Sequence, residues 1–114
     1  MLKSKIHGAF VTEADVEYEG SIGIDQSLLE LSGILPFEKV HVWNRSNGQR
    51  FETYTIVEPP KSGKISVNGA AALLVKPGDG LIIASFTWTD QNTASTLIPR
   101  IVLVDSRNIG KLKD

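Results

Sequence analysis

Short runs of strand-forming residues, each ended by a turn signal, set the main limit on how this chain can fold. The run Val40–Trp43 alternates in polarity, Ser46–Gly48 supplies a turn that accepts positive φ, and Arg50–Ile56 alternates again. This pattern predicts a β-hairpin. The continuous apolar run Leu81–Ala84 predicts a strand buried on both faces. Many short strands in one small chain favour a closed barrel, because closure removes unpaired strand edges.

The N-terminal part fits the same mainly β plan and leaves room for short helices only. Lys5–Val11 and Tyr18–Ile24 are rich in β-branched and apolar residues and predict two strands. Asp25 precedes the run Gln26–Ser32, and Gly33 follows it. An acidic N-cap and a glycine just past the end predict a short helix over this run.

The C-terminal half contains further short elements. Ile65–Val67 predicts a brief strand, and Asn68–Leu73 predicts one helical turn. Thr87–Ser95 is polar and predicts a loop, whereas Ile101–Val104 predicts a final strand. The last residues, 110–114, predict a frayed tail.

Length and composition limit the classes of function. A chain of 114 residues fits one hydrophobic core, so we expect residues 1–114 to form a single domain. The net charge of −1 argues against a nucleic acid or an anionic membrane as partner. The absence of cysteine excludes thiolate nucleophiles and sulfur-ligated metals. Without an apolar signal segment or a run of about 18 apolar residues, the chain is predicted to be cytoplasmic.

Two features that could carry chemistry have ordinary structural explanations when they are taken alone. His7 and His41 lie 34 positions apart, with no carboxylates at a metal-ligand spacing. We therefore assign no metal site. The pair Gly20-Ser21 is by itself a turn signal, because glycine followed by a small polar residue is typical of loops.

Two further features favour recognition of a carboxylate, again only as alternatives. The small residues of Asn68-Gly69-Ala70-Ala71 suit close packing at a helix start, but the bare N–H groups there also suit a carboxylate ligand. Arg50 has Glu52 and Glu58 as candidate ion-pair partners, and its planar guanidinium equally suits a bound carboxylate.

Taken together, these motifs resemble the pyruvoyl-dependent aspartate 1-decarboxylase family. The resemblance runs from Met1 to about Phe86 and more weakly from Pro99 to Asn108. Its most specific parts are Gly20-Ser21 and Asn68-Gly69-Ala70-Ala71. The other matching motifs are Lys5-Ile6-His7, Tyr18-Glu19, Ile24-Asp25, Asn47-Gly48 with Arg50, Thr53-Tyr54, Ser66-Val67, Ala72, Gly78-Asp79 and Ile82-Ile83.

The resemblance implies a mainly β fold, a double-psi β-barrel with short helices, assembled as a homotetramer. It also implies self-cleavage between Gly20 and Ser21, which gives a small chain 1–20 and a large chain 21–114. Ser21 would become a covalent pyruvoyl group, the only cofactor. Glycine suits this position because it leaves its carbonyl open to attack by the Ser21 hydroxyl. In the family Thr53 stabilises the oxyanion that develops at this step.

For catalysis the resemblance implies decarboxylation of L-aspartate to β-alanine through a Schiff base with the pyruvoyl group, a step that feeds pantothenate and coenzyme A synthesis. Lys5 and Arg50 would bind substrate carboxylates, and Tyr54 would supply the proton. The backbone of Asn68, Gly69, Ala70 and Ala71 would orient the bound substrate. His7 and Trp43 align near the family's site, but their chemistry assigns them no role.

Gly8 and Leu73 depart from the family pattern, in which both positions are commonly basic. Neither departure removes a group that the chemistry needs, but both bear on the rate of self-cleavage and on any need for a helper protein. One alternative is a catalytically inactive β-barrel that only binds ligands, which an uncleavable chain would indicate. A nucleic-acid-binding barrel would need a basic face interleaved with aromatic residues, and the composition gives it little support.

Overall fold

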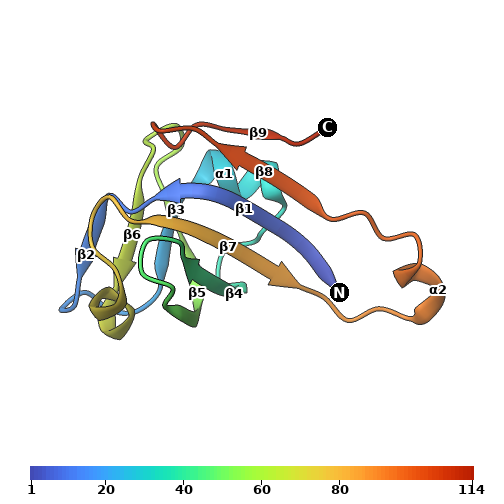
Figure 1. Ribbon diagram of the computed structural model, residues 1–114, viewed down its shortest axis with the longest axis horizontal. Coiled ribbons are helices and arrows are strands. Elements are labelled where there is room, and N and C mark those ends of the chain that lie inside the picture. Colours follow the sequence, from blue (N-terminus) through green and yellow to red (C-terminus); the bar gives the residue numbers. More distant parts are fainter.

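The computed structural model describes residues 1–114, which form a mainly β structure with short helices (Figure 1). The elements, in chain order, are β1 (Leu2–Phe10), β2 (Glu13–Asp15), β3 (Ile22–Asp25), α1 (Gln26–Ser32), β4 (Lys39–Asn44), β5 (Arg50–Glu58), β6 (Ile65–Asn68), the 3-10 helix η1 (Gly69–Leu74), β7 (Gly80–Phe86), α2 (Gln91–Ala94), β8 (Arg100–Val104) and β9 (Gly110–Leu112).

Most strands pair with partners that are distant in the sequence. The spatial order is β2-β6-β3-β5-β4-β7-β1-β8-β9. The predicted hairpin of β4 and β5 is confirmed, since the two strands pair antiparallel. Strand β3 lies between β5, which runs parallel to it, and β6, which runs antiparallel. Because the first residue of β3 follows Ser21, this arrangement decides the surroundings of the predicted cleavage point.

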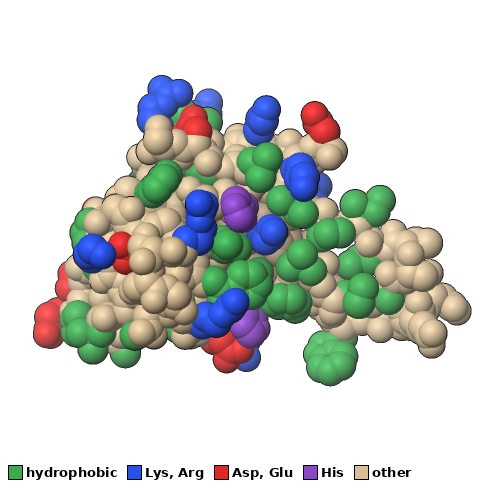
Figure 2. Space-filling view, viewed as in Figure 1, with side chains coloured by type: hydrophobic (Ala, Val, Ile, Leu, Met, Phe, Trp, Pro, Cys, Tyr) green, Lys and Arg blue, Asp and Glu red, His purple; other side chains and the backbone are tan.

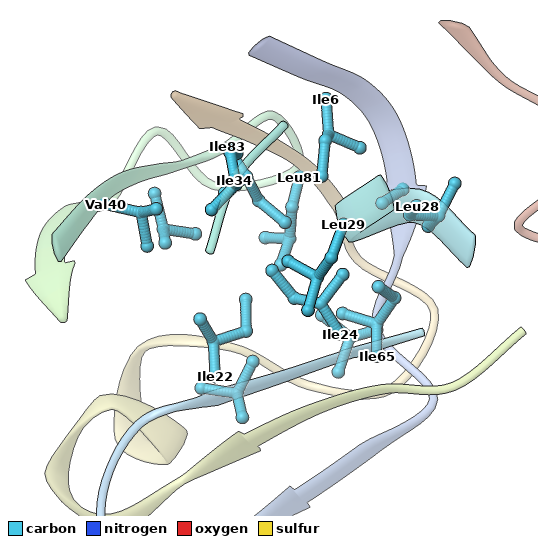
Figure 3. Close-up of a cluster of buried hydrophobic side chains, with 14 of the residues drawn as sticks. Ile6, Ile22, Ile24, Leu28, Leu29, Ile34, Val40, Ile65, Leu81 and Ile83 are labelled. Atoms are coloured by element: carbon cyan, nitrogen blue, oxygen red, sulfur yellow. The ribbon is translucent and has the colours of Figure 1, made fainter. Parts of the chain in front are cut away.

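Side chains from both halves of the strand order meet in one interior, which closes the sheet around a common core (Figure 3). Ile65 of β6, Ile22 and Ile24 of β3, Ile83 of β7 and Ile6 of β1 are all fully buried there. Burying each such side chain stabilises the fold by roughly 1.5–3 kcal/mol. The expectation of a closed arrangement of short strands is therefore confirmed.

Helix α1 forms where the sequence predicts it. The Asp25 carboxylate accepts a hydrogen bond from the Ser27 N–H at 2.7 Å, and Gly33 ends the helix with φ +72°. The helix buries Leu28 and Leu29 against the core. No helix in the structure combines the length and the apolar character needed to cross a membrane.

The N-terminal side differs from its prediction in two places. The strand expected over Tyr18–Ile24 begins only at Ile22, because the chain before it bends, with positive φ at Gly20 and Ser21. The exposed segment Glu13–Asp15 forms the additional strand β2, which pairs parallel with β6. This pairing depends on a partner strand about fifty residues away in the sequence. The residues of β2 are all exposed and too few to show a clear alternation between apolar and polar, so nothing local marks the strand.

The C-terminal region also differs from its prediction in two places. The predicted frayed tail forms β9, which pairs antiparallel with β8. The predicted loop contains α2, whose N-cap Asp90 accepts a hydrogen bond from the Thr93 N–H at 2.7 Å. The segment that carries α2 projects away from the barrel (Figure 1), and the molecule accordingly measures 44 × 24 × 24 Å.

Candidate active site

The predicted cleavage point lies in a strained turn immediately before β3. Gly20 has φ +27° and Ser21 has φ +89°. Positive φ is uncommon for a residue with a side chain, and holding one there costs about 1–3 kcal/mol. Such a conformation persists only where the surrounding structure fixes it.

Strand β6 and the start of η1 hold this turn. The Asn68 N–H donates a hydrogen bond to the Ser21 carbonyl oxygen at 3.0 Å. Gly69 has φ +65°, and a Cβ at this position would lie 3.3 Å from both the Cα and the N of Gly20. The absence of a side chain at Gly69 thus lets the backbone of η1 pack directly against Gly20. The structure brings Asn68 and Gly69 to the predicted cleavage point.

The Ser21 hydroxyl is buried and has no hydrogen-bond partner. The residue is 3% exposed, and its Oγ neither donates to nor accepts from any protein group. Leaving a buried polar group unpaired costs free energy, so such groups in folded proteins call for an explanation. A hydroxyl that is free of competing bonds and adjacent to the Gly20 carbonyl is suited to attack that carbonyl.

Tyr54 lies against the same turn. A Cβ built on Gly20 would be 3.0 Å from the Tyr54 hydroxyl oxygen, so glycine at position 20 is what allows this approach. The Tyr54 ring centroid is 6.5 Å from that of Phe37. Both rings line a surface pocket that is completed by Glu17, Tyr18, Glu19 and Ile56. The predicted proton donor therefore lies between the cleavage point and solvent.

Thr53 does not contact the turn in the same way. Alternation along β5 places Thr53 and Tyr54 on opposite faces of the strand. The Thr53 hydroxyl makes no hydrogen bond to Gly20. Continuing the register of β3 with β5 back from Ile22 would nevertheless set Gly20 beside the Thr53 backbone.

Arg50 belongs to a second cluster, on the outward face of β4 and β5. Its guanidinium carbon lies 4.9 Å from the centre of the Trp43 ring, a cation–π contact. Beside it, His41 Nε2 lies 3.2 Å from a Glu52 carboxylate oxygen, and the His41 ring meets Phe86 edge-on at 5.1 Å. These side chains line an open pocket together with Phe51.

Lys5 of β1 lies on the same outward face as Arg50 of β5, but β4 and β7 lie between these two strands. The register places Lys5 opposite Ala84, Ala84 opposite His41, and His41 opposite Glu52. Three strand spacings of about 4.8 Å put the backbones of Lys5 and Glu52 roughly 14 Å apart. Figure 2 shows apolar side chains in the middle of this face with basic and histidine side chains around them. The pocket that Arg50 lines includes neither Lys5 nor Ser21.

His7 shares the outward face of β1 with Lys5. Burial lowers the pKa of His7, and the positive charges of Lys5, Arg45 and Lys113 lower it further. Its Nδ1 atom is buried and has no hydrogen-bond partner. These surroundings favour the neutral imidazole.

The two positions that depart from the family pattern lie on β1 and η1. Gly8 has φ +95° at an irregularity in the pairing of β1 with β7, and a Cβ there would lie 3.5 Å from an Arg45 guanidinium nitrogen. Leu73 is 74% exposed on η1. The structure contains no group of three or more His, Asp or Glu side chains that could hold a metal ion.

Some contacts around the site had no signal in the sequence. Glu58 of β5 accepts a hydrogen bond from the Ser66 hydroxyl of β6, and this bond passes over Gly23 of β3. The packing of Gly69 against Gly20 had only a general signal, the run of small residues. Both depend on strand pairings between distant segments.

The strand arrangement around this site identifies the class of protein. The fold is a double-psi β-barrel. It is similar to the crystal structure of the rationally designed mkDPBB_sym_86 protein, with a TM-score of 0.51 at 14% identity over 71% of this chain and 95% of the other.

The family follows from comparison of sequences. The aspartate decarboxylase family model matches residues 1–111, and the chain belongs to this family. It is 56% identical over 108 residues to the aspartate 1-decarboxylase of Pelotomaculum thermopropionicum, which covers 95% of this chain and 82% of the relative. It is also 50% identical over 108 residues to that of Hyphomonas neptunium, covering 95% and 92%. The resemblance seen in the motifs is therefore confirmed.

Proposed function

We propose that this chain is a proenzyme that cleaves its own Gly20–Ser21 bond and then converts L-aspartate to β-alanine and carbon dioxide. The β-alanine is used to make pantothenate. The Ser21 hydroxyl attacks the Gly20 carbonyl carbon, and the peptide C–N bond breaks to leave an ester and a free amine. Elimination of the ester releases the Gly20 carboxylate and leaves dehydroalanine at position 21. Addition of one water and loss of ammonia then give the pyruvoyl group.

The single observation that carries this proposal is the buried, unpartnered Ser21 hydroxyl in a turn where both Gly20 and Ser21 have positive φ. Strain at the bond to be broken favours cleavage, because it is relieved when the chain separates. Tyr54 beside Gly20 and Asn68 on the Ser21 carbonyl enclose this position. The residues present therefore fit a pyruvoyl group formed at position 21.

When formed, the pyruvoyl group supplies a ketone that accepts the substrate amine and withdraws electrons as carbon dioxide leaves. The protein's own residues bind and orient the substrate. Arg50 and Lys5 hold its carboxylates by charge-assisted hydrogen bonds. Asn68, Gly69, Ala70 and Ala71 orient it with backbone groups, and Tyr54 donates a proton to the substrate carbon. Thr53 supports the oxyanion during self-cleavage.

The separation of Lys5 and Arg50 from Ser21 supports assembly as a homotetramer. In one copy the pocket lined by Arg50 includes neither Lys5 nor Ser21, Phe86 at the end of β7 is 47% exposed, and Trp88 just beyond it is completely exposed. A second copy that covers this face would bury apolar surface and bring its cations to the neighbouring Ser21. A native mass of four copies after purification is the expected result, and a monomer that is fully active would contradict it.

Self-cleavage is tested by intact-protein mass spectrometry of the wild type and of Ser21→Ala. We expect the wild type to separate into chains 1–20 and 21–114, the larger with a blocked N-terminus, and the variant to stay intact. Wild-type protein that decarboxylates aspartate while remaining one chain would contradict the pyruvoyl proposal. A wild type that neither cleaves nor turns over aspartate would instead favour the inactive binding module.

A further inference from the structure

A hydrogen bond between side chains of β5 and β6 passes across β3 just beyond the cleavage point. The Ser66 hydroxyl donates to the Glu58 carboxylate. Gly23 is paired with Ser66 and lies beneath this bond. Gly23 follows Ser21 by two residues, so the bond holds β3 where the strained turn enters it.

Gly23 is a glycine for reasons of space. Its φ is not positive, so its backbone conformation is open to other residues. A Cβ at this position would lie 2.9 Å from the Glu58 carboxyl carbon and would overlap both Ser66 Oγ and the bonded Glu58 oxygen. Any side chain at position 23 must therefore displace the bond between Glu58 and Ser66.

The same carboxylate connects to the outer strands. The Glu58 side chain is only 15% exposed, and its second oxygen lies 3.8 Å from the Lys64 ammonium. Lys64 in turn lies 3.3 Å from a Glu13 carboxylate oxygen on β2. Strand β6 also carries Asn68, whose N–H binds the Ser21 carbonyl oxygen. Fixing β6 relative to β3 and β5 thus fixes the donor that holds Ser21.

We propose that Glu58 is a positioning residue for self-cleavage, acting through its hydrogen bond to Ser66 over Gly23. This inference rests on the proposed function. Glu58 does not touch the Gly20–Ser21 bond. It holds β3 in the register that keeps Ser21 at positive φ with its hydroxyl unpaired. Once the chain is cut, the strained turn no longer exists, so Glu58 should affect turnover far less than cleavage, and only through the position of Asn68 on β6.

The test measures three quantities for each variant: the rate of self-cleavage by mass spectrometry, turnover per pyruvoyl group in the cleaved fraction, and the melting temperature. Glu58→Ala, Ser66→Ala and Gly23→Ala should each slow cleavage roughly tenfold or more, because a hydrogen bond to a charged group is lost. Turnover per pyruvoyl should stay within about twofold of wild type. The double variant Glu58→Ala with Ser66→Ala should be no slower than either single variant, since one bond is lost in all three.

Two controls separate positioning from general stability. Glu58→Gln keeps an acceptor oxygen for Ser66 and should restore cleavage to within about threefold of wild type. Val102→Ala makes a cavity under β8, away from β3, and should lower the melting temperature without slowing cleavage. Equal slowing in Val102→Ala, or wild-type cleavage in both Glu58→Ala and Ser66→Ala, would overturn the positioning role. If the wild type itself does not cleave, the proposed function fails instead.

Discussion

The turn at Gly20 and Ser21 and the outward face around Arg50 are built in opposite ways. The turn is enclosed, strained and held by backbone groups of β6 and η1 from the same chain. The outward face is open, and Arg50 and Lys5 lie on it without a partner that fixes them in a closed pocket. One region is enclosed by the folding of a single chain, whereas the other is left open by it.

On the proposed function, this difference separates two reactions in one small protein. Self-cleavage would use the turn that a single folded chain already forms, so it should proceed once the barrel has formed. Turnover of aspartate would also need cations from the outward face. Changes near the turn should therefore alter maturation, and changes on the face should alter turnover.

Tyr54 borders both regions, and its replacement should give the largest effect on turnover. Tyr54→Phe removes the hydroxyl beside Gly20 and keeps the ring near Phe37, so packing should change little. Loss of a positioned general acid should lower β-alanine formation by about 10²–10⁴-fold. Cleavage should survive, because it needs Ser21 and oxyanion support. The measurement is turnover per pyruvoyl group in protein shown by mass spectrometry to be cleaved.

Two outcomes would change the assignment of Tyr54 to turnover alone. Near-wild-type turnover per pyruvoyl in Tyr54→Phe would assign the proton to another group or to solvent. Failure of this variant to cleave would show that the two reactions share Tyr54, and that the approach of its hydroxyl to Gly20 serves maturation as well.

Arg50→Lys should have a smaller effect that is confined to turnover. The substitution keeps the charge but loses the planar fork and the stacking over Trp43. Losing one charge-assisted pair should lower kcat/KM for aspartate roughly tenfold to a hundredfold, with cleavage unchanged. Arg107→Lys, at an exposed turn, is the matched control and should behave as wild type. Unchanged aspartate kinetics in fully cleaved Arg50→Lys protein would remove Arg50 from substrate binding.

Elements with local signals were predictable from the sequence, and those that depend on distant pairing were not. Helix α1 has both of its boundaries in the residues that cap it, Asp25 and Gly33. The strands β2 and β9 are three residues long and largely exposed, and they exist only because β6 and β8 pair with them. No clear alternation of polarity marks such strands, so the sequence predicted no strand at β2 and suggested a frayed tail in place of β9.

The site, too, was predictable from the sequence only where its signals are local. The motifs of Gly20-Ser21 and Asn68-Gly69 drew attention to the right segments, and the structure places the two side by side. The positive φ of Ser21 could not be predicted, because serine is rarely found there and nothing local requires it. It results from the strands on either side of β3, which the sequence does not reveal. The separation of Lys5 from Glu52 likewise follows from strand order alone.

The smallest expected effect concerns His7 and tests the basic character of the outward face. Burial and the charges of Lys5, Arg45 and Lys113 hold its pKa below the ordinary value of 6.5. In the pH range between the lowered folded pKa and 6.5 the unfolded chain binds more protons, so the folded state loses stability as the pH falls through this range. The melting temperature of wild type should therefore drop more between neutral and mildly acidic pH than that of His7→Gln. Because the rest of the chain is identical in the two proteins, the difference between the two curves reports His7. Parallel curves, or a wild type that gains stability on acidification relative to the variant, would show that the cations around His7 do not act on it, and that this part of the face is less positive than its residues indicate.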